Sequence, residues 1–270
     1  SVFVQSALGF PDDNLATTAS WSLRMVGGSD WTAADAMAVN ASTTTGLPGD
    51  VVIRNQSTFR YNNPQTIVGS WSGAVGKLRT GNGDIQIAAS RDVVIEGLPT
   101  RAVDGRVIDN ANMSLAPKAV IYTAGLPVIE GTADSVYPTG GGNITIRAGR
   151  NISGAAGGQK EYLNDWLRRS TVAVQDDLIG TAAGWWVVRD AFRDDVGTLG
   201  GGNIVLSAGG DIADVSAMLP TFGLVGVGAS GKPTIDVQGG GNLDLRADGN
   251  VDGGEFLVGR GLARIAAGGA

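Results

Sequence analysis

Acidic side chains are the first candidates for chemistry in this sequence. They occur as adjacent pairs at Asp12-Asp13, Asp176-Asp177 and Asp194-Asp195. Two neighbouring carboxylates can bind calcium, or act as an acid and a base on a glycosidic bond. Adjacent residues of a strand face opposite ways, however, and these pairs lie in predicted loops, where carboxylates are normally solvated. We therefore expect the three pairs to lie at the surface.

Single acids occupy glycine-rich corners of a repeated pattern, at Asp84, Asp92, Asp211 and Asp248. Carboxylates at such corners bind calcium in β-roll proteins, whose glycine-aspartate repeat is nine residues long. That spacing is missing here. Asp is also a common turn residue because its side chain bonds to nearby backbone N–H groups, so we expect these acids to shape turns.

Trp185 and Trp186 are the residues that the sequence offers for contact with a partner. Tryptophan rings can stack on sugars, but aromatic residues in an insertion more often pack on the scaffold beneath them. Packing is therefore the expected role, and partner contact is the alternative.

Two further motifs predict little. The glycine runs precede strands and lack a following Gly-Lys-Ser/Thr, so they do not resemble phosphate-binding loops. Asn-x-Ser/Thr sequons, which can accept sugar in a secreted protein, begin at Asn40, Asn55, Asn112, Asn143 and Asn151. The last two belong to the repeat itself, so we expect most of the sequons to be coincidental.

Composition narrows the function further. The 270 residues include no histidine and no cysteine, which removes the commonest general base, the commonest transition-metal ligand and any disulfide. A net charge of −6 argues against nucleic acid or an anionic membrane as a partner. The apolar runs are too short to span a membrane. We expect no catalytic residue, no cofactor, no metal and no membrane insertion.

These residues are positioned by strands and corners that a repeated sequence motif predicts. The motif occurs four times, over Gly81–Val93, Gly140–Ile152, Gly200–Ile212 and Gly239–Val251. Each copy has a glycine corner, a polar Asn or Asp, a five-residue strand and a second corner. Apolar and polar residues alternate along the strand, which indicates one buried face. The buried residues end small, and we place these ends at Ala88, Ala148, Ala208 and Ala247.

The spacing of the copies predicts a solenoid. Asp84 and Asn143 are 59 residues apart (143 − 84), Asn143 and Asn203 are 60 apart, and Asn203 and Asn242 are 39 apart. These distances are near three, three and two times about 20 residues, a typical solenoid repeat. We therefore expect degenerate coils between the clear copies, and roughly ten coils in all. Direct contact between these asparagines is not implied.

The predicted fold is all-β, a parallel β-helix interrupted by one insertion. Residues 1–50 form an irregular start, 51–158 and 198–270 form coils, and 159–197 form the insertion. Within it, Glu161–Arg169 has apolar residues spaced as in a short amphipathic helix. Because the chain starts at a serine and no signal peptide follows, we interpret it as a piece of a longer protein.

The order of several motifs resembles the repeat region of large filamentous haemagglutinin-like exoproteins. The resemblance runs from about Trp21 and depends on the GGGN motifs, Ala119–Gly125, Trp185-Trp186 leading to Val196–Gly200, and Gly254–Gly261. It implies a right-handed β-helix, two-partner secretion through an outer-membrane transporter, and a place at the bacterial cell surface. The family's secretion motif is approached only at Asn63-Pro64-Gln65, which indicates an interior or distal segment.

Two functions of different classes remain. The first is a non-enzymatic spacer or filament segment of a secreted adhesin, which would contact other copies of itself, a host or neighbouring cell surface, or a glycan. The second is a polysaccharide lyase or glycosidase, since β-helices also support such enzymes. An enzyme needs carboxylates that converge in one groove, and the outward strand positions form no acidic row: they are Gln86, Thr145, Arg147, Val205, Ser207, Asp244 and Arg246.

Overall fold

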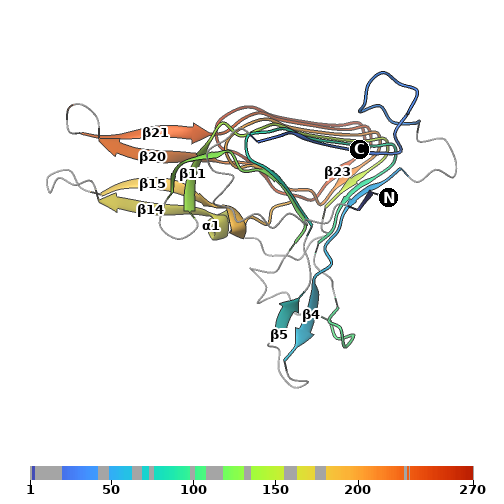
Figure 1. The fold of residues 1–270 in the computed structure, drawn as a ribbon, viewed down its shortest axis with the longest axis horizontal. Coiled ribbons are helices and arrows are strands. Elements are labelled where there is room, and N and C mark those ends of the chain that lie inside the picture. The colour runs from blue at the N-terminus through green and yellow to red at the C-terminus, as the bar shows by residue number, and fades with distance from the viewer. Residues whose placement is uncertain are drawn as a thin grey trace.

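The computed structural model of the chain is all-β, with parallel sheets at its centre (Figure 1). It describes residues 2–3, 20–41, 49–62, 69–72, 76–97, 101–107, 118–130, 135–154, 163–173, 181–227, 230 and 232–269. The predicted all-β class is confirmed.

Three parallel sheets form the body. Sheet I contains β2 (Leu23–Gly27), β7 (Ile85–Ala89), β12 (Ile144–Ala148), β17 (Ile204–Ala208), β22 (Leu243–Ala247) and β25 (Ala263–Ala267). Sheet II contains β1 (Val2–Phe3), β3 (Val51–Ile53), β8 (Val93–Ile95), β13 (Ile152–Ser153), β18 (Ile212–Ala213) and β23 (Val251–Asp252). Sheet III contains β6 (Lys77–Thr80), β9 (Val120–Thr123), β16 (Val196–Thr198), β19 (Ala217–Leu219) and β24 (Phe256–Val258).

The chain visits these sheets in a fixed order. Strands β7, β8 and β9 enter sheets I, II and III in turn, and β12 then returns to sheet I beside β7. We call each such pass a rung. Five passes follow this order, beginning at β2, β7, β12, β17 and β22, and β25 opens a sixth.

One column of side chains explains why the rungs stack. In sheet I, Met25, Ile87, Ile146, Leu206 and Leu245 lie in register, and all are buried. The residues between them along each strand face outward, as the alternation predicts. A rung cannot bury its apolar face alone, but stacked rungs share one continuous core.

The predicted number of coils is wrong, and the register shows why. Partners in neighbouring rungs are separated by 59, 60, 39 and finally 20 residues, so the four repeated motifs lie on adjacent rungs. No degenerate coils lie between them. The largest parallel sheets have six strands in place of roughly ten, which spans about 24 Å at 4.8 Å per strand. In the first motif the buried end is Ala89, because Ala148 pairs with Ala89 and not with Ala88.

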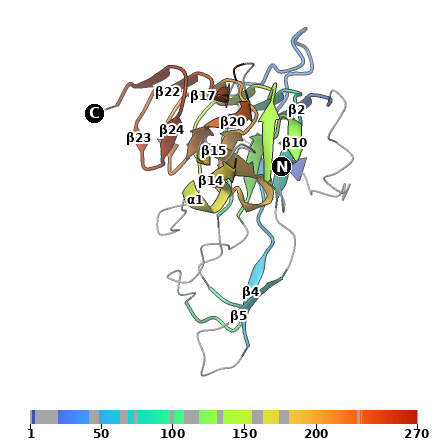
Figure 2. The same cartoon turned by 90° about the vertical axis from the view of Figure 1, so that its left-hand side faces the viewer.

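The extra residues of the long rungs form antiparallel strands outside the body (Figures 1 and 2). One hairpin, β4 (Thr58–Tyr61) with β5 (Gly69–Ser72), projects away from the other insertions. A four-stranded sheet has the order β10 (Leu126–Glu130), β11 (Ser135–Thr139), β15 (Thr181–Val188), β14 (Leu167–Ala173). A further hairpin joins β20 (Thr221–Val227) to β21 (Pro233–Gly239).

The predicted helix over Glu161–Arg169 is found only in part: residues 163–166 are helical, residues 167–169 belong to a strand, and 161–162 lie outside the described residues. Only α1 (Leu163–Trp166) is helical among the described residues, followed by a short 3-10 turn at Arg189–Ala191 farther along. Strand β14 starts at Leu167 and pairs with β15. Trp166 and Leu167 are both buried, so the helix-like spacing of apolar residues serves two successive elements. Pairing with β15 outweighs the weak helical propensity of so short a segment.

The polar residue before each strand forms a ladder that links the rungs. Its side-chain oxygen accepts the backbone N–H of the equivalent residue on the following rung. Before sheet I the ladder runs Ser22, Asp84, Asn143, Asn203, Asn242, Leu262, the last only as a donor. Before sheet II it runs Asp50, Asp92, Asn151, Asp211, Asn250. Before sheet III it runs Asp195, Ser216, Glu255. The asparagines thus do contact one another.

Removing one ladder member tests this arrangement. Asn203→Ala deletes the acceptor for the Asn242 N–H, at 2.9 Å, and a donor to Asn143. Because the ladder is exposed, we expect the free energy of unfolding to fall by only about 1 kcal/mol. Urea denaturation measures this change. Ser207→Ala, on the outward face of the adjoining strand, is the control, and an equal loss in both variants would contradict the role of the ladder.

Candidate functional site

The insertions gather on the outer face of sheet III. Strands β9, β16 and β19 are buried throughout, so this sheet is covered on both faces. A second apolar cluster covers the outer face, formed by Val120, Tyr122, Ala124, Trp166, Leu167, Val187, Phe192, Leu199, Met218 and Phe222. It joins the body to the four-stranded sheet and the β20–β21 hairpin. We call the insertions on this side the lateral platform.

Trp166 anchors the platform. Its ring packs edge-on against Phe192 with centroids 5.1 Å apart, and Phe192 packs on Tyr122 of β9 at 5.4 Å. Its indole N–H donates a hydrogen bond to Oδ2 of Asp194. A tryptophan that fills a buried gap and satisfies its polar atom fixes orientation as well as position. Trp166 therefore sets how the platform sits on the body.

The surface position predicted for Asp194-Asp195 is wrong. The two residues are 3% and 1% exposed, and Nζ of the buried Lys118 lies 3.0 Å from Oδ1 of Asp195. Burial raises the pKa of the Asp195 carboxyl above its usual value, while the Lys118 charge and the Ser216 N–H oppose that rise. The pair is buried because other residues cover the corner before β16: the Trp166 indole of the platform bonds to Asp194, and the buried Lys118 lies beside Asp195. The other two acidic pairs lie outside the described residues.

The anchor makes a testable prediction. Trp166→Phe keeps a ring but leaves the buried Asp194 without the indole donor. We expect a loss of about 1 to 3 kcal/mol in the free energy of unfolding and faster amide hydrogen exchange in β14 and β15. Trp31→Phe is the matched control, because Trp31 is 93% exposed. Unchanged exchange in the platform of Trp166→Phe would contradict the anchoring role.

Trp185 and Trp186 lie side by side in β15, opposite Arg169 and Arg168 of β14. The Trp186 side chain is partly buried, in agreement with the packing role. The side chain of Trp185 lies outside the described residues. Partner contact through this pair stays a prediction.

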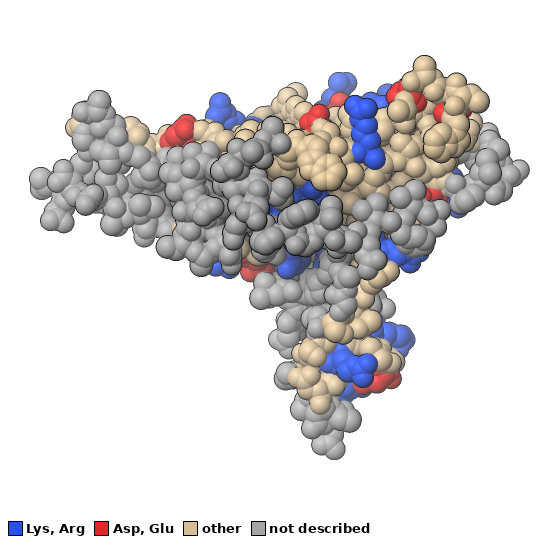
Figure 3. All heavy atoms as spheres, in the orientation of Figure 1, with Lys and Arg blue, Asp and Glu red and all other residues tan. Residues whose placement is uncertain are grey.

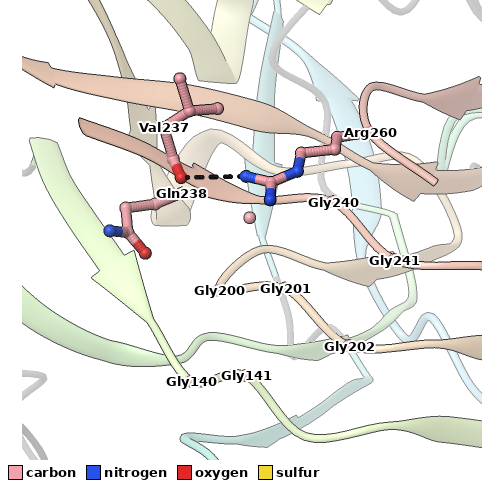
Figure 4. Close-up of a pocket in the computed structure, with 11 residues that line it drawn as sticks. Gly140, Gly141, Gly200, Gly201, Gly202, Val237, Gln238, Gly240, Gly241 and Arg260 are labelled. Carbon is pink, nitrogen blue, oxygen red and sulfur yellow. Dashed lines mark hydrogen bonds between the residues drawn. The ribbon is translucent and has the colours of Figure 1, made fainter. Parts of the chain in front are cut away.

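A cleft of about 550 Å³ opens where the platform meets the corners of three rungs (Figure 4). Glycines of these corners line it, with Val237, Gln238 and Arg260. Several of the glycine N–H groups donate to neighbouring rungs: Gly141 to Gly200, Gly202 to Gly240, and Gly241 to Arg260. The glycines thus let backbones approach closely and do not form a phosphate-binding loop.

No family model, no curated protein and no solved structure matches the chain. The site must therefore be interpreted from its own geometry.

The remaining predicted positions have structural partners. Asp84, Asp92 and Asp211 are ladder members that accept backbone N–H groups of the following rung, which the turn interpretation did not anticipate, whereas Asp248 lies 3.5 Å from Arg246. Among the sequons, Asn143 and Asn151 are also in the ladders, Asn40 and Asn55 bond to nearby backbone carbonyls, and Asn112 lies outside the described residues.

In the described part of the chain, no group of three or more acidic, histidine or cysteine side chains could hold a metal ion. No described helix is long and apolar enough to cross a membrane. Among the described residues on the face drawn in Figure 3, basic and acidic side chains are scattered and form no continuous patch of either sign.

Sequence reasoning missed Lys118 and Trp166. Lys118 precedes the apolar run of β9 directly, at a corner that points inward. A signal was available, because Lys118 and Asp195 lie beside each other on neighbouring rungs. It can be recognised only when the rungs are aligned correctly, and the sequence spacing had led to a wrong alignment.

Proposed function

We propose that this chain is a right-handed parallel β-helix that serves as a rigid, non-enzymatic segment of a secreted bacterial surface adhesin or filament. The assignment to filamentous haemagglutinin-like exoproteins, with export by an outer-membrane transporter, follows the resemblance of the repeated motifs. The body supplies stiffness, and the lateral platform supplies the surface that meets other molecules.

One observation supports the proposal above the others. Register is kept across neighbouring rungs although their lengths range from 20 to 62 residues. The core and the corner ladders hold the body in place, so insertions of very different size leave it unchanged. A scaffold of this kind suits a spacer that holds its insertions at fixed positions along the stacking axis of the rungs.

The outward face of sheet I fits this role better than catalysis. Its equivalent positions carry Arg24, Gln86, Thr145, Val205, Asp244 and Arg264, so one acid occurs in that row. Cleavage of a glycosidic bond by two carboxylates needs a second acid within several ångströms. The partners we propose are a cell surface, a glycan or another copy of the chain.

Electron microscopy of intact cells, with gold-labelled antibodies against this chain, tests the proposal. We expect labelled rods or fibres outside the outer membrane, and loss of label after brief protease treatment of intact cells. Label confined to the interior of the cell would overturn the surface assignment. Release of new reducing ends from bacterial or host polysaccharides by the purified chain would overturn the non-enzymatic assignment.

A further inference from the structure

A lysine and an aspartate touch in the sealed interior between the body and the lateral platform. Nζ of Lys118 lies 3.0 Å from Oδ1 of Asp195, and the two side chains are 5% and 1% exposed. Burying two opposite charges costs several kcal/mol per ion before their attraction is counted. A pair held this way in a structural segment calls for a reason other than stability.

The sheet register fixes the two residues relative to each other. Lys118 stands just before β9 and Asp195 just before β16, and these strands pair at Ile121 and Val196. The Asp195 carbonyl accepts the Ile121 N–H at 2.7 Å. Asp195 also has a left-handed φ of +27°, a conformation that Asp tolerates better than most residues. Neither side chain depends on a long loop for its position.

The surroundings supply what an acyl transfer between these groups requires. Asp194, the residue before Asp195, is 3% exposed; its carboxylate is held by the Trp166 indole, and its charge acts on the Asp195 carboxyl. Oδ2 of Asp195 accepts the Ser216 N–H at 2.8 Å, a donor suited to a developing oxyanion. Trp166 belongs to a buried aromatic cluster with Phe192 and Tyr122, and burial of this kind favours the uncharged amine and acid over the ion pair.

We propose that Lys118 and Asp195 condense to an intramolecular isopeptide bond. A proton first passes from the ammonium to the carboxylate, which leaves an amine and a carboxylic acid. Nζ then attacks Cγ of Asp195, and Oδ2 takes up negative charge beside the Ser216 N–H. Asp194 accepts a proton from Nζ and returns it to Oδ1, which departs as water. One C–N bond forms, one C–O bond breaks, and one water is released without a cofactor.

The bond would join two neighbouring rungs at the root of the lateral platform. It would close the loop from residue 118 to residue 195, which contains the four-stranded sheet and α1. A covalent link at this point would keep the base of the platform together even when the rest of it unfolds. The inference stands apart from the proposed surface function, because it depends only on the buried contacts.

Intact-mass spectrometry of the denatured, purified chain is the direct test. We expect the wild-type chain to be lighter than its sequence by one water molecule, and a proteolytic digest to yield one branched peptide that joins residues 118 and 195. Lys118→Met and Asp195→Leu should have the full mass. Asp194→Asn keeps an acceptor for the Trp166 indole but cannot relay the proton, so it should lose most of the cross-link while circular dichroism shows a native fold.

Asp211→Asn, another acid at a pre-strand corner, is the control and should show the same mass deficit as the wild type. A folded wild-type chain that keeps its full mass after long incubation between acidic and alkaline pH would overturn the proposal. So would a deficit that persists in Lys118→Met, because the water would then have been lost elsewhere.

Discussion

Gly241→Ala is expected to lower the free energy of unfolding by about 3 kcal/mol or more, one of the two largest effects that we predict. A Cβ at this position would overlap the carbonyl oxygen of Gly202 on the preceding rung. Its φ of +146° is also a conformation that residues with a side chain rarely adopt. The same overlap recurs at equivalent corners: Gly83, Gly142, Gly202 and Gly261. Guanidinium denaturation followed by circular dichroism measures the loss.

Gly140→Ala separates the two causes. Gly140 also has a positive φ, of +61°, but a Cβ there would meet no atom within 4 Å. We expect the free energy of unfolding of this variant to fall by only about 1 to 2 kcal/mol, which is the cost of placing alanine at a positive φ. If both variants lost the same amount, close approach of the rungs would not be what selects glycine at these corners.

Ile146→Ala is expected to cost about 3 to 4 kcal/mol, because it opens a cavity in the middle of the stacked core. Ile146 is fully buried between Ile87 and Leu206, in register with both. Neighbouring rungs are held by their own hydrogen bonds and cannot collapse far into the space. Thermal unfolding and urea denaturation of the same variant both report this loss.

Ile265→Ala is the matched comparison, since Ile265 occupies the same column on the last rung. It pairs with Leu245 but is 48% exposed, so its truncation removes less buried surface and leaves no closed cavity. We expect a loss below about 1 kcal/mol. Equal losses at the two positions would mean that the column is not the stabilising core.

The strands of the body could be predicted because each has a local signal. Alternation of apolar and polar residues places Ile144, Ile146 and Ala148 on one face, and the structure pairs them with equivalent residues on both sides. The polar residue before the strand was recognised as a repeated corner. Both features depend on a few consecutive residues, which a sequence displays directly.

The stacking could not be predicted because it depends on where intervening residues go. A separation of 39 residues, as between Asn203 and Asn242, fits two short coils or one coil with a long insertion equally well. The hairpin over 221–239 decided the matter, because antiparallel strands satisfy their backbone hydrogen bonds locally and leave the neighbouring rungs free to pair. The burial of Asp194 and Asp195 depends on the alignment of the rungs. Because the sequence did not give the correct alignment, it did not give this burial either.

The corner ladders give the molecule a direction. At every corner described above, the side chain belongs to the earlier rung and the backbone N–H to the later one. When a chain is synthesised or translocated with its N-terminus first, the preceding rung can already be folded. Its ladder side chains are then in place to accept the backbone N–H groups of the next rung. The ladder bonds alone therefore favour assembly from the N-terminal rung onward, since in the backbone bonds at the strand starts the earlier rung supplies the donor, as the Ile85 N–H does to the Asn143 carbonyl.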